Sequence, residues 1–255
     1  WKDLGEHLSQ AISNFSPNEA IIFVKVVDAF KDEKLLVLTK KGQIKQVELE
    51  SFSPWRTYRS KSTAYGKLKG EDDRIVMVEP VQFNDVLLIS ENGYALRFNL
   101  DDVPVLGAKA AGVKAMNLKG DDVIQNAFFT SSDSWYLLTQ RGFIKRVATS
   151  DIPTTTRANR GLQVLRTLKN NNHTVFASGL VYPSKTELSA LTEDVNLFTE
   201  PVSTDKTAEQ QILSVLTDSN EEIDMDLMAL ALSERTSNGH PISENIRNLQ
   251  SSQLK

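Results

Sequence analysis

The sequence predicts an all-β fold built from four-stranded repeats, and three observations support this prediction. Similar segments, LVLTKKGQIKQV, LLISENGYALRF and YLLTQRGFIKRV, occupy residues 36–47, 87–98 and 136–147. Their strand-ending hydroxyl residues, Thr39, Ser90 and Thr139, are 51 and 49 residues apart. Helix-period patterns are scarce along the chain. A repeat of about 50 residues with about four strands has the size of a propeller blade.

Each of the three segments is predicted to be a β-hairpin. An apolar strand ends in Thr or Ser, and a glycine follows three residues later, at Gly42, Gly93 and Gly142. Glycine is favoured there because the last residue of a short turn adopts positive φ. A fourth, weaker copy is ILSVLTDSNEEIDMDL, in which Asn220 takes the turn position. Asparagine is the residue other than glycine that best tolerates positive φ.

A second glycine follows each hairpin and is assigned a turn or structural role. It lies 22 residues after the hydroxyl residue in the second, third and fourth copies, and in a longer version of the same element in the first. A short apolar strand, a polar turn and a further apolar strand come next, and together they complete the four-stranded unit. These glycines are Gly112, Gly161, Gly239 and Gly66.

One domain is predicted over residues 1–250. A truncated blade is expected at residues 1–30, and the chain, which starts without Met, is expected to be a fragment of a longer protein. Complete blades are anchored near 36–47, 87–98, 136–147 and 212–226. Residues 182–211 are predicted to be an insertion or irregular segment, with a strand near Val195–Pro201, and residues 251–255 a tail.

The composition excludes several classes of protein. Hydrophobic residues make up 40% and charged residues 24% of the chain, as in soluble globular proteins. No apolar run approaches the roughly 18 residues that a membrane span needs. The absence of cysteine excludes disulfides and removes the commonest structural zinc ligands. The 3 histidines lack metal-ligand spacing, and the paired acids at 72–73, 101–102 and 121–122 are interpreted as turn residues. No metal or catalytic residue is predicted.

Charge is distributed unevenly along the chain. The net charge is −4, but residues 181–255 contain 5 Lys and Arg against 13 Asp and Glu. The remaining residues therefore carry 24 basic and 20 acidic side chains, a balance of +4. Because the body is mildly basic and the C-terminal part acidic, the net charge is a poor guide to partners.

Several segments resemble a known family. WKDLGEHLSQ, FSPWRTYRSKS, NGYALRFNLDDVPVLGAKAAGVKAMNLK, LLTQRGFIKRV, RANRGLQVLR and LSERTSNG are similar to the C-terminal domain of bacterial type IIA topoisomerase A subunits. The particular resemblance is to topoisomerase IV A subunits of Gram-positive, streptococcus-like bacteria. It implies a β-pinwheel, a propeller-like disc whose blades exchange strands.

The resemblance also implies a function. In that family the disc binds double-stranded DNA along a basic rim, without sequence preference, and orients the transported duplex for ATP-dependent decatenation or relaxation. The domain itself needs no cofactor. The catalytic tyrosine, Mg²⁺ and ATP belong to other parts of a heterotetramer formed with the ATPase B subunit in the bacterial cytoplasm, at the nucleoid. No membrane partner is implied.

Repeated basic residues are the candidates for DNA contact. They lie on the second strand of the hairpins and in the loops that follow, and such a row of cations can follow a phosphate backbone. Strand alternation places the adjacent Lys145 and Arg146 on opposite faces. The candidates are Lys45, Arg56, Arg59, Lys61, Arg97, Lys109, Lys114, Lys145, Arg146, Arg157, Arg160 and Arg235.

Three alternatives remain open at this stage. Gyrase A domains wrap DNA with a glycine-rich basic box, QRRGGKG, which neither RANRG at 157–161 nor GAKAAG at 107–112 reproduces. A propeller that acts only as a protein-interaction scaffold is compatible with the acidic residues scattered through the body. A propeller enzyme would need a cluster of carboxylates or histidines that the sequence does not offer.

Overall fold

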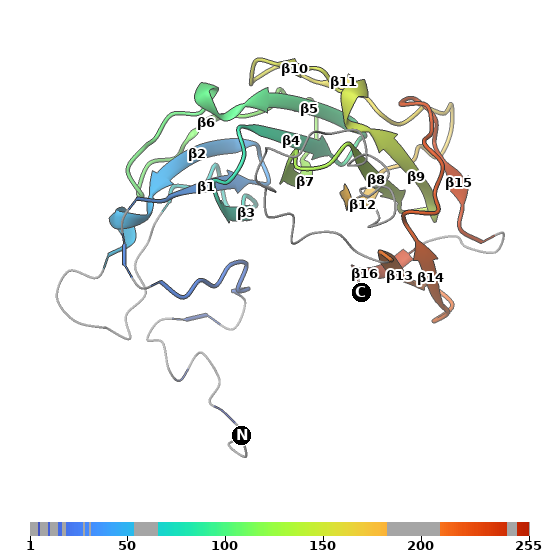
Figure 1. Cartoon of the computed structure of the whole chain (residues 1–255), viewed down its shortest axis with the longest axis horizontal. Helices are drawn as coiled ribbons and strands as arrows, with labels where there is room; N and C mark the ends of the chain where they lie inside the picture. The colour runs from blue at the N-terminus through green and yellow to red at the C-terminus, as the bar shows by residue number, and fades with distance from the viewer. Residues whose placement is uncertain are drawn as a thin grey trace, which may run out of the picture. The chain divides into compact units, whose positions relative to one another are not determined.

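The computed structural model of the chain is all-β, as predicted (Figure 1). It describes residues 5, 10, 15–16, 19–27, 29–30, 32–53, 66–182, 210–243 and 249–254. The chain divides into two compact units, Trp1–Gln82 with Asp101–Ala115, and Phe83–Leu100 with Met116–Lys255. This differs from the single domain predicted over 1–250, because residues 101–115 follow the second hairpin in sequence but pack with the first.

The first unit contains one four-stranded sheet. Its strands β1 (Lys34–Thr39), β2 (Gln43–Glu48), β3 (Ile75–Pro80) and β6 (Val113–Lys114) lie in the order β3-β1-β2-β6. β1 and β2 form the predicted hairpin, and the 3-10 helix η1 (Leu49–Phe52) follows it. β6 comes after the next hairpin in sequence, yet it pairs with β2. The sheet therefore takes its strands from two consecutive repeats.

The second unit repeats this exchange in two of its sheets. One contains β4 (Asp85–Ser90), β5 (Tyr94–Asn99), β7 (Ile124–Phe129) and β10 (Thr154–Thr155), with β11 (Leu162–Gln163) also on β5. The next has the order β12-β8-β9-β15 and contains β8 (Ser134–Thr139), β9 (Phe143–Ala148), β12 (Val175–Val181) and β15 (His240–Pro241). In both sheets, the second strand of the hairpin accepts short strands from the following repeat.

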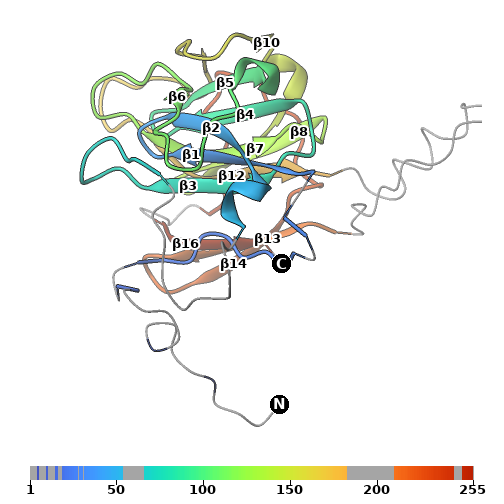
Figure 2. The ribbon, with the colours of Figure 1, turned by 90° about the vertical axis from the view of Figure 1, so that its left-hand side faces the viewer.

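The last sheet of the second unit has three strands among the described residues. β13 (Ile212–Thr217) pairs with β14 (Glu222–Asp226) on one side and with β16 (Leu249–Leu254) on the other. Figure 2 shows these strands as a separate layer below β4 and β8. The short helices η2 (Leu100–Asp102) and η3 (Thr149–Asp151) follow the second and third hairpins.

Two apolar clusters lie within the second unit, each packed from more than one sheet. Gln125 on β7 donates from Nε2 to the Phe176 carbonyl on β12 at 2.8 Å, and Asn126 donates to the Ser178 carbonyl, so polar bonds join these two strands. One cluster contains Leu87, Ile89, Ala95, Phe128, Trp135, Leu137, Val147, Ile152, Val164, Leu165 and Val175. The other contains Tyr136, Leu138, Ile144, Val181, Leu213, Val215, Leu227 and Leu249. The apolar faces of the hairpins are therefore core, as predicted.

The strand-ending hydroxyl of each hairpin is a turn cap. The side-chain oxygen of Thr39 accepts the backbone N–H of Gln43 at 3.2 Å, four residues on. Ser90, Thr139 and Thr217 make the equivalent bond to Tyr94, Phe143 and Glu221. All four hydroxyl residues are buried, so this bond satisfies an N–H at each tight turn. The turn position is at positive φ, as predicted, at Gly42, Gly93, Gly142 and Asn220.

The second glycine of each repeat lies against the backbone of the preceding hairpin. We call residues 105–112, 154–161 and 232–239 the crossing loops, because each leads from its own hairpin to the second strand of the one before. A Cβ on Gly112 would lie 2.8 Å from the Ile44 carbonyl oxygen. On Gly161 and Gly239 it would lie 2.4 Å from the Ala95 oxygen and 2.3 Å from the Ile144 oxygen. These three glycines are needed for close approach as well as for positive φ.

Other predictions about the ends of the repeats need correction. Gly66 does not share the crossing-loop geometry, since a Cβ there would meet nothing within 4 Å and its φ is not positive. No strand lies among the described residues of the expected blade at 1–30, and the rest of that segment lies outside the described residues. The expected tail is wrong for residues 251–254, which belong to β16 because β13 offers them an open edge. Residues 183–209, with the strand expected near Val195–Pro201, lie outside the described residues.

Replacing Gly112 by alanine should destabilise the protein by about 1–3 kcal/mol, because the new Cβ clashes with the Ile44 carbonyl at a positive φ. Urea unfolding measures the change. The matched control is Gly107→Ala in the same segment, where a Cβ meets nothing within 4 Å, and its effect should stay within about 0.5 kcal/mol. Equal stability of the two variants would contradict the close approach.

Candidate nucleic-acid interface

Each crossing loop is fastened at both ends to the second strand of the preceding hairpin. At its start a parallel bridge joins Val105 to Gln46, Thr154 to Arg97, or Leu232 to Arg146. At its end, the residue after the glycine pairs antiparallel with that strand, as Val113 does with Ile44. The residues between these two attachments project from the sheet. The same sequence spacing thus produces the same loop three times.

Basic side chains from these loops reach the surface. Lys109 and Arg160 are exposed, and so is Lys114, directly after the first loop in β6. Arg157 and Arg235 are half-buried. Each loop has a cation three or four residues before its glycine, and this recurrence places positive charge on equivalent parts of the fold.

Arg160 is held by an aromatic ring. Its guanidinium carbon lies 4.1 Å from the centre of the Tyr94 ring, which is the geometry of a cation–π contact. Such stacking fixes the direction of the side chain while leaving N–H groups at the edge of the guanidinium for an anion. Tyr94 was missed by sequence reasoning. The sequence signal that could have identified Tyr94 is its position directly after the turn glycine, beside a loop that recurs in three repeats.

Three half-buried arginines, Arg97, Arg146 and Arg235, contribute to the fold. Arg235 Nη1 donates to the Gln163 carbonyl at 2.6 Å. Arg97 forms an ion pair with Asp85, with Nη2 at 2.9 Å from Oδ2. Arg146 donates from Nε to Ser134 Oγ at 2.8 Å and from Nη1 to the Met228 carbonyl at 3.2 Å. Each of these side chains therefore has an intramolecular partner in addition to any contact with a ligand.

The structure corrects the prediction for Lys45 and Lys145. Their exposed fractions are 3% and 1%, so neither ammonium group faces solvent where DNA would bind. Lys45 Nζ donates to the carbonyls of Ala108 and Ala110, and Lys145 Nζ donates to those of Val164, Arg235 and Ser237. Strand alternation predicts on which face of the strand each lysine lies. It does not predict their burial, because the crossing loops that cover them come from the next repeat.

Burial also changes the protonation of these lysines. Loss of hydration lowers the pKa of Lys45. Loss of hydration, and to a smaller extent the positive Arg235, lowers the pKa of Lys145 to about 7. The carbonyl oxygens around each Nζ favour the charged form, because an ammonium has three N–H donors and a neutral amine only two. Both lysines therefore have a structural role.

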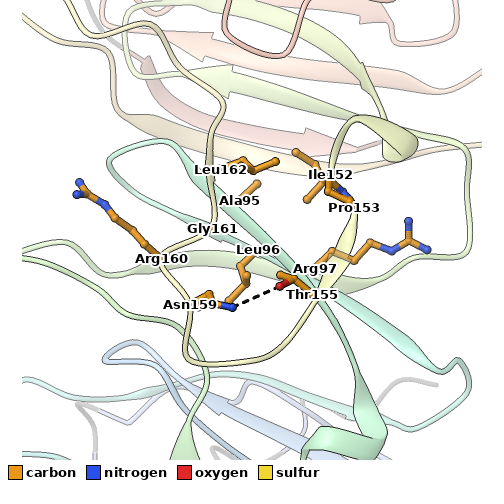
Figure 3. Close-up of a pocket in the computed structure, with 10 residues that line it drawn as sticks. All are labelled: Ala95, Leu96, Arg97, Ile152, Pro153, Thr155, Asn159, Arg160, Gly161 and Leu162. Carbon is orange, nitrogen blue, oxygen red and sulfur yellow. Dashed lines mark hydrogen bonds between the residues drawn. The ribbon is translucent and has the colours of Figure 1, made fainter.

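The second hairpin has Leu96 where the first and third have Lys45 and Lys145. A pocket of about 360 Å³ lies beside it, between β5 and the crossing loop (Figure 3). Asn159 spans part of this loop, donating from Nδ2 to Thr155 Oγ1 at 3.3 Å and to the Thr156 carbonyl at 3.1 Å. Figure 3 shows Arg160 and Arg97 on opposite sides of the pocket and directed away from it. The pocket is lined by Ala95, Leu96, Arg97, Ile152, Pro153, Thr155, Asn159, Arg160, Gly161 and Leu162.

Three further candidates, Arg56, Arg59 and Lys61, lie outside the described residues. Two of the three acidic pairs lie in turns, as predicted, and Asp73 accepts the backbone N–H of Lys41 at 2.9 Å and of Lys69 at 3.0 Å, whereas Asp101 and Asp102 belong to η2. Among the described residues, no group of three or more His, Asp or Glu side chains is arranged to hold a metal ion. In the same part of the chain, no helix is long and apolar enough to cross a membrane.

Comparison with known proteins identifies the family to which this fold belongs. A family model described as the DNA gyrase C-terminal domain, a β-propeller, matches residues 33–82, 84–131 and 133–178. The A subunit of DNA topoisomerase 4 from Streptococcus pneumoniae is 51% identical over 247 residues, which are 96% of this chain and 29% of that protein. Its counterpart from Bacillus subtilis is 39% identical over 184 residues, 71% of this chain and 23% of that protein. The chain thus spans less than a third of the length of these relatives.

Solved structures agree in fold. The C-terminal domain of DNA topoisomerase IV matches with a TM-score of 0.79 and 28% identity, covering 100% of this chain and 71% of that one. The DNA gyrase A C-terminal domain matches with a TM-score of 0.69 and 18% identity, covering 99% of this chain and 75% of that one. The three segments matched by the family model correspond to the three strongest repeats. The chain is similar to streptococcal topoisomerase 4 A subunits and to the C-terminal domain of topoisomerase IV, and it therefore belongs to the family of β-propeller C-terminal domains of DNA gyrase.

Proposed function

We propose that this chain is a non-catalytic DNA-binding domain of the A-type polypeptide of topoisomerase IV, and that its crossing loops contact the phosphate backbone of a duplex. The observation that supports this most directly is that each of three loops of the same geometry has a cation three or four residues before its glycine, namely Lys109, Arg157 and Arg235. Arg160, stacked on Tyr94, adds a directed guanidinium to the second loop.

The kind of contact follows from the charge of DNA. A duplex has a negative charge about every 1.7 Å along its axis, so cations on successive loops find phosphates without needing a particular base sequence. The helices that follow the first three hairpins are short 3-10 turns, which are unlike the recognition helices that read bases in the major groove. Binding is therefore sequence-tolerant and depends on salt.

Within the whole enzyme, we propose that the domain binds and orients the transported duplex for decatenation and relaxation. Its partners are the ATPase B subunit together with the rest of its own polypeptide, in a heterotetramer of the bacterial cytoplasm at the nucleoid. ATP, Mg²⁺ and the catalytic tyrosine act outside this domain. The similarity to topoisomerase 4 A subunits over 96% of the chain, but only 29% of their length, supports this division of labour.

The double variant Arg157→Ala/Arg160→Ala should weaken duplex binding by a similar factor for every sequence tested. It should also reduce the slope of log K against log salt by up to about 2, because about 0.9 is lost for each phosphate contact removed. Fluorescence anisotropy with several labelled duplexes over a salt titration measures both quantities.

The matched control for this double variant is Lys119→Ala/Lys169→Ala, which removes two exposed cations from turns outside the crossing loops. It changes net charge equally and should reduce affinity less. An Arg157→Ala/Arg160→Ala variant with unchanged affinity and salt slope would remove the second crossing loop from the interface.

The purified chain should neither cleave DNA nor relax a supercoiled plasmid, with or without ATP and Mg²⁺, because the proposal assigns strand passage to other parts of the enzyme. Agarose gels of plasmid topoisomers test this directly. The positive control is a complete topoisomerase IV under the same conditions. Relaxation that copurifies with the isolated chain and tracks its concentration would refute the non-catalytic assignment.

A further inference from the structure

Two buried lysines occupy the same place in their hairpins and share two bonds to a crossing loop, and Lys145 also donates to the Val164 carbonyl. Lys45 and Lys145 each lie three residues after the turn glycine of their hairpin. Each Nζ donates hydrogen bonds to the backbone carbonyls of the residues four and two positions before the second glycine of the repeat, Gly112 or Gly239. These are Ala108 and Ala110 in the first crossing loop, and Arg235 and Ser237 in the third. The same bonds between lysine and loop carbonyls occur in both units, so they belong to the shared architecture of the hairpin and its crossing loop.

Packing alone does not require a lysine at this position. The second hairpin has Leu96 there, fully buried, so the same backbone accepts an apolar side chain. A buried ammonium carries a desolvation cost that leucine avoids. The lysines must therefore contribute something that an apolar residue cannot, and the contribution visible in the structure is their bond to the loop carbonyls.

The three crossing loops differ in the side-chain hydrogen bonds that form within each loop. In the second loop, Asn159 bonds to Thr155 and Thr156, and in the third loop Ser237 Oγ donates to the Glu234 carbonyl at 3.0 Å, so side chains fix both loops from within. The first loop reads GAKAA from Gly107 to Ala111, and Lys109 is its only polar side chain. Such a loop offers no internal side-chain bonds to its own backbone, apart from any made by Lys109. Lys45 supplies the missing attachment from the sheet.

The attachment determines how Lys109 is presented. Its two neighbours, Ala108 and Ala110, both have their carbonyls turned inward to the ammonium of Lys45. Lys109 stands between them and is exposed. We propose that Lys45 is a positioning residue for DNA binding, which holds the first crossing loop so that Lys109 faces the phosphate backbone.

This inference rests on the proposed function, since it needs Lys109 to contact DNA. A loop that is ordered before binding does not have to lose conformational freedom in the complex, which is how a buried residue can change affinity without touching the ligand. Lys45 and Lys109 should therefore act as one unit in binding, although only Lys109 meets the phosphate.

A double-mutant cycle in the full chain tests this coupling. We expect Lys45→Met to weaken binding of a labelled duplex by roughly 3–10-fold at moderate salt, comparable to Lys109→Ala, as coupled neighbours do. In the Lys109→Ala background, Lys45→Met should change affinity by less than about twofold. The matched control is Leu96→Met, which makes a similar side chain at the equivalent place in the second hairpin and should change neither binding nor loop order.

Hydrogen exchange without DNA gives a second readout that does not depend on the proposed function. Amides of residues 107–111 should exchange faster in Lys45→Met than in the wild type, while those of 154–161 stay unchanged. If Lys45→Met fails to fold, Lys45→Leu replaces it, because Leu96 shows that leucine fits this position.

The outcomes separate the two proposals. Equal weakening by Lys45→Met in both backgrounds, or no weakening in either, would overturn the positioning role while leaving DNA binding intact. Wild-type chain that shows no salt-dependent duplex binding would overturn the proposed function and the positioning role together. In that case faster exchange at 107–111 would still show that Lys45 orders the loop, and unchanged exchange would reject that too.

Discussion

The contact between each crossing loop and the backbone of the preceding hairpin is the constraint on which the rest of this fold depends. At Gly112, Gly161 and Gly239 the loop and the hairpin strand come so close that an added Cβ would lie 2.3–2.8 Å from a carbonyl oxygen. That approach lets the short strands β6, β11 and β15 pair with the hairpins before them. It also fixes both ends of each loop, and so determines which residues project. Core, sheet order and candidate interface all follow from the same three places.

Charge in this protein has two separate uses that look alike in the sequence. Lys45 and Lys145 satisfy backbone carbonyls in the interior, and Arg97 neutralises Asp85 within its sheet. Lys109 reaches the surface on a loop bonded to Lys45, and Arg160 on a loop fixed by Asn159. Under the proposed positioning role, the buried Lys45 sets the geometry in which the exposed Lys109 can act. A count of basic residues therefore overstates the charge that is available to a partner.

The sequence predicted the hairpins well, because each is local: the alternation, the capping hydroxyl and the turn glycine all lie within twelve residues. It also predicted that the second glycine was structural. It did not show that Gly112 approaches Ile44, since that partner belongs to another repeat and spacing alone does not say which strand a loop meets. The burial of Lys45 was missed for the same reason. Strand β16 was missed because SSQLK has neither the apolar alternation nor the β-branched residues of the other strands, and only the open edge of β13 recruits it.

The exchange of strands has a consequence for how the protein is made. The sheet of β1, β2 and β3 gains β6 only after the chain has been synthesised as far as Lys114, beyond the whole of the next hairpin. The sheet of β8, β9 and β12 waits still longer, because β15 comes after residues 183–209 and the hairpin of β13 and β14. During translation, each of these two nascent sheets therefore exposes the edge of its second hairpin strand until the strand that pairs with it leaves the ribosome, and the order of synthesis is also the order in which those edges are closed.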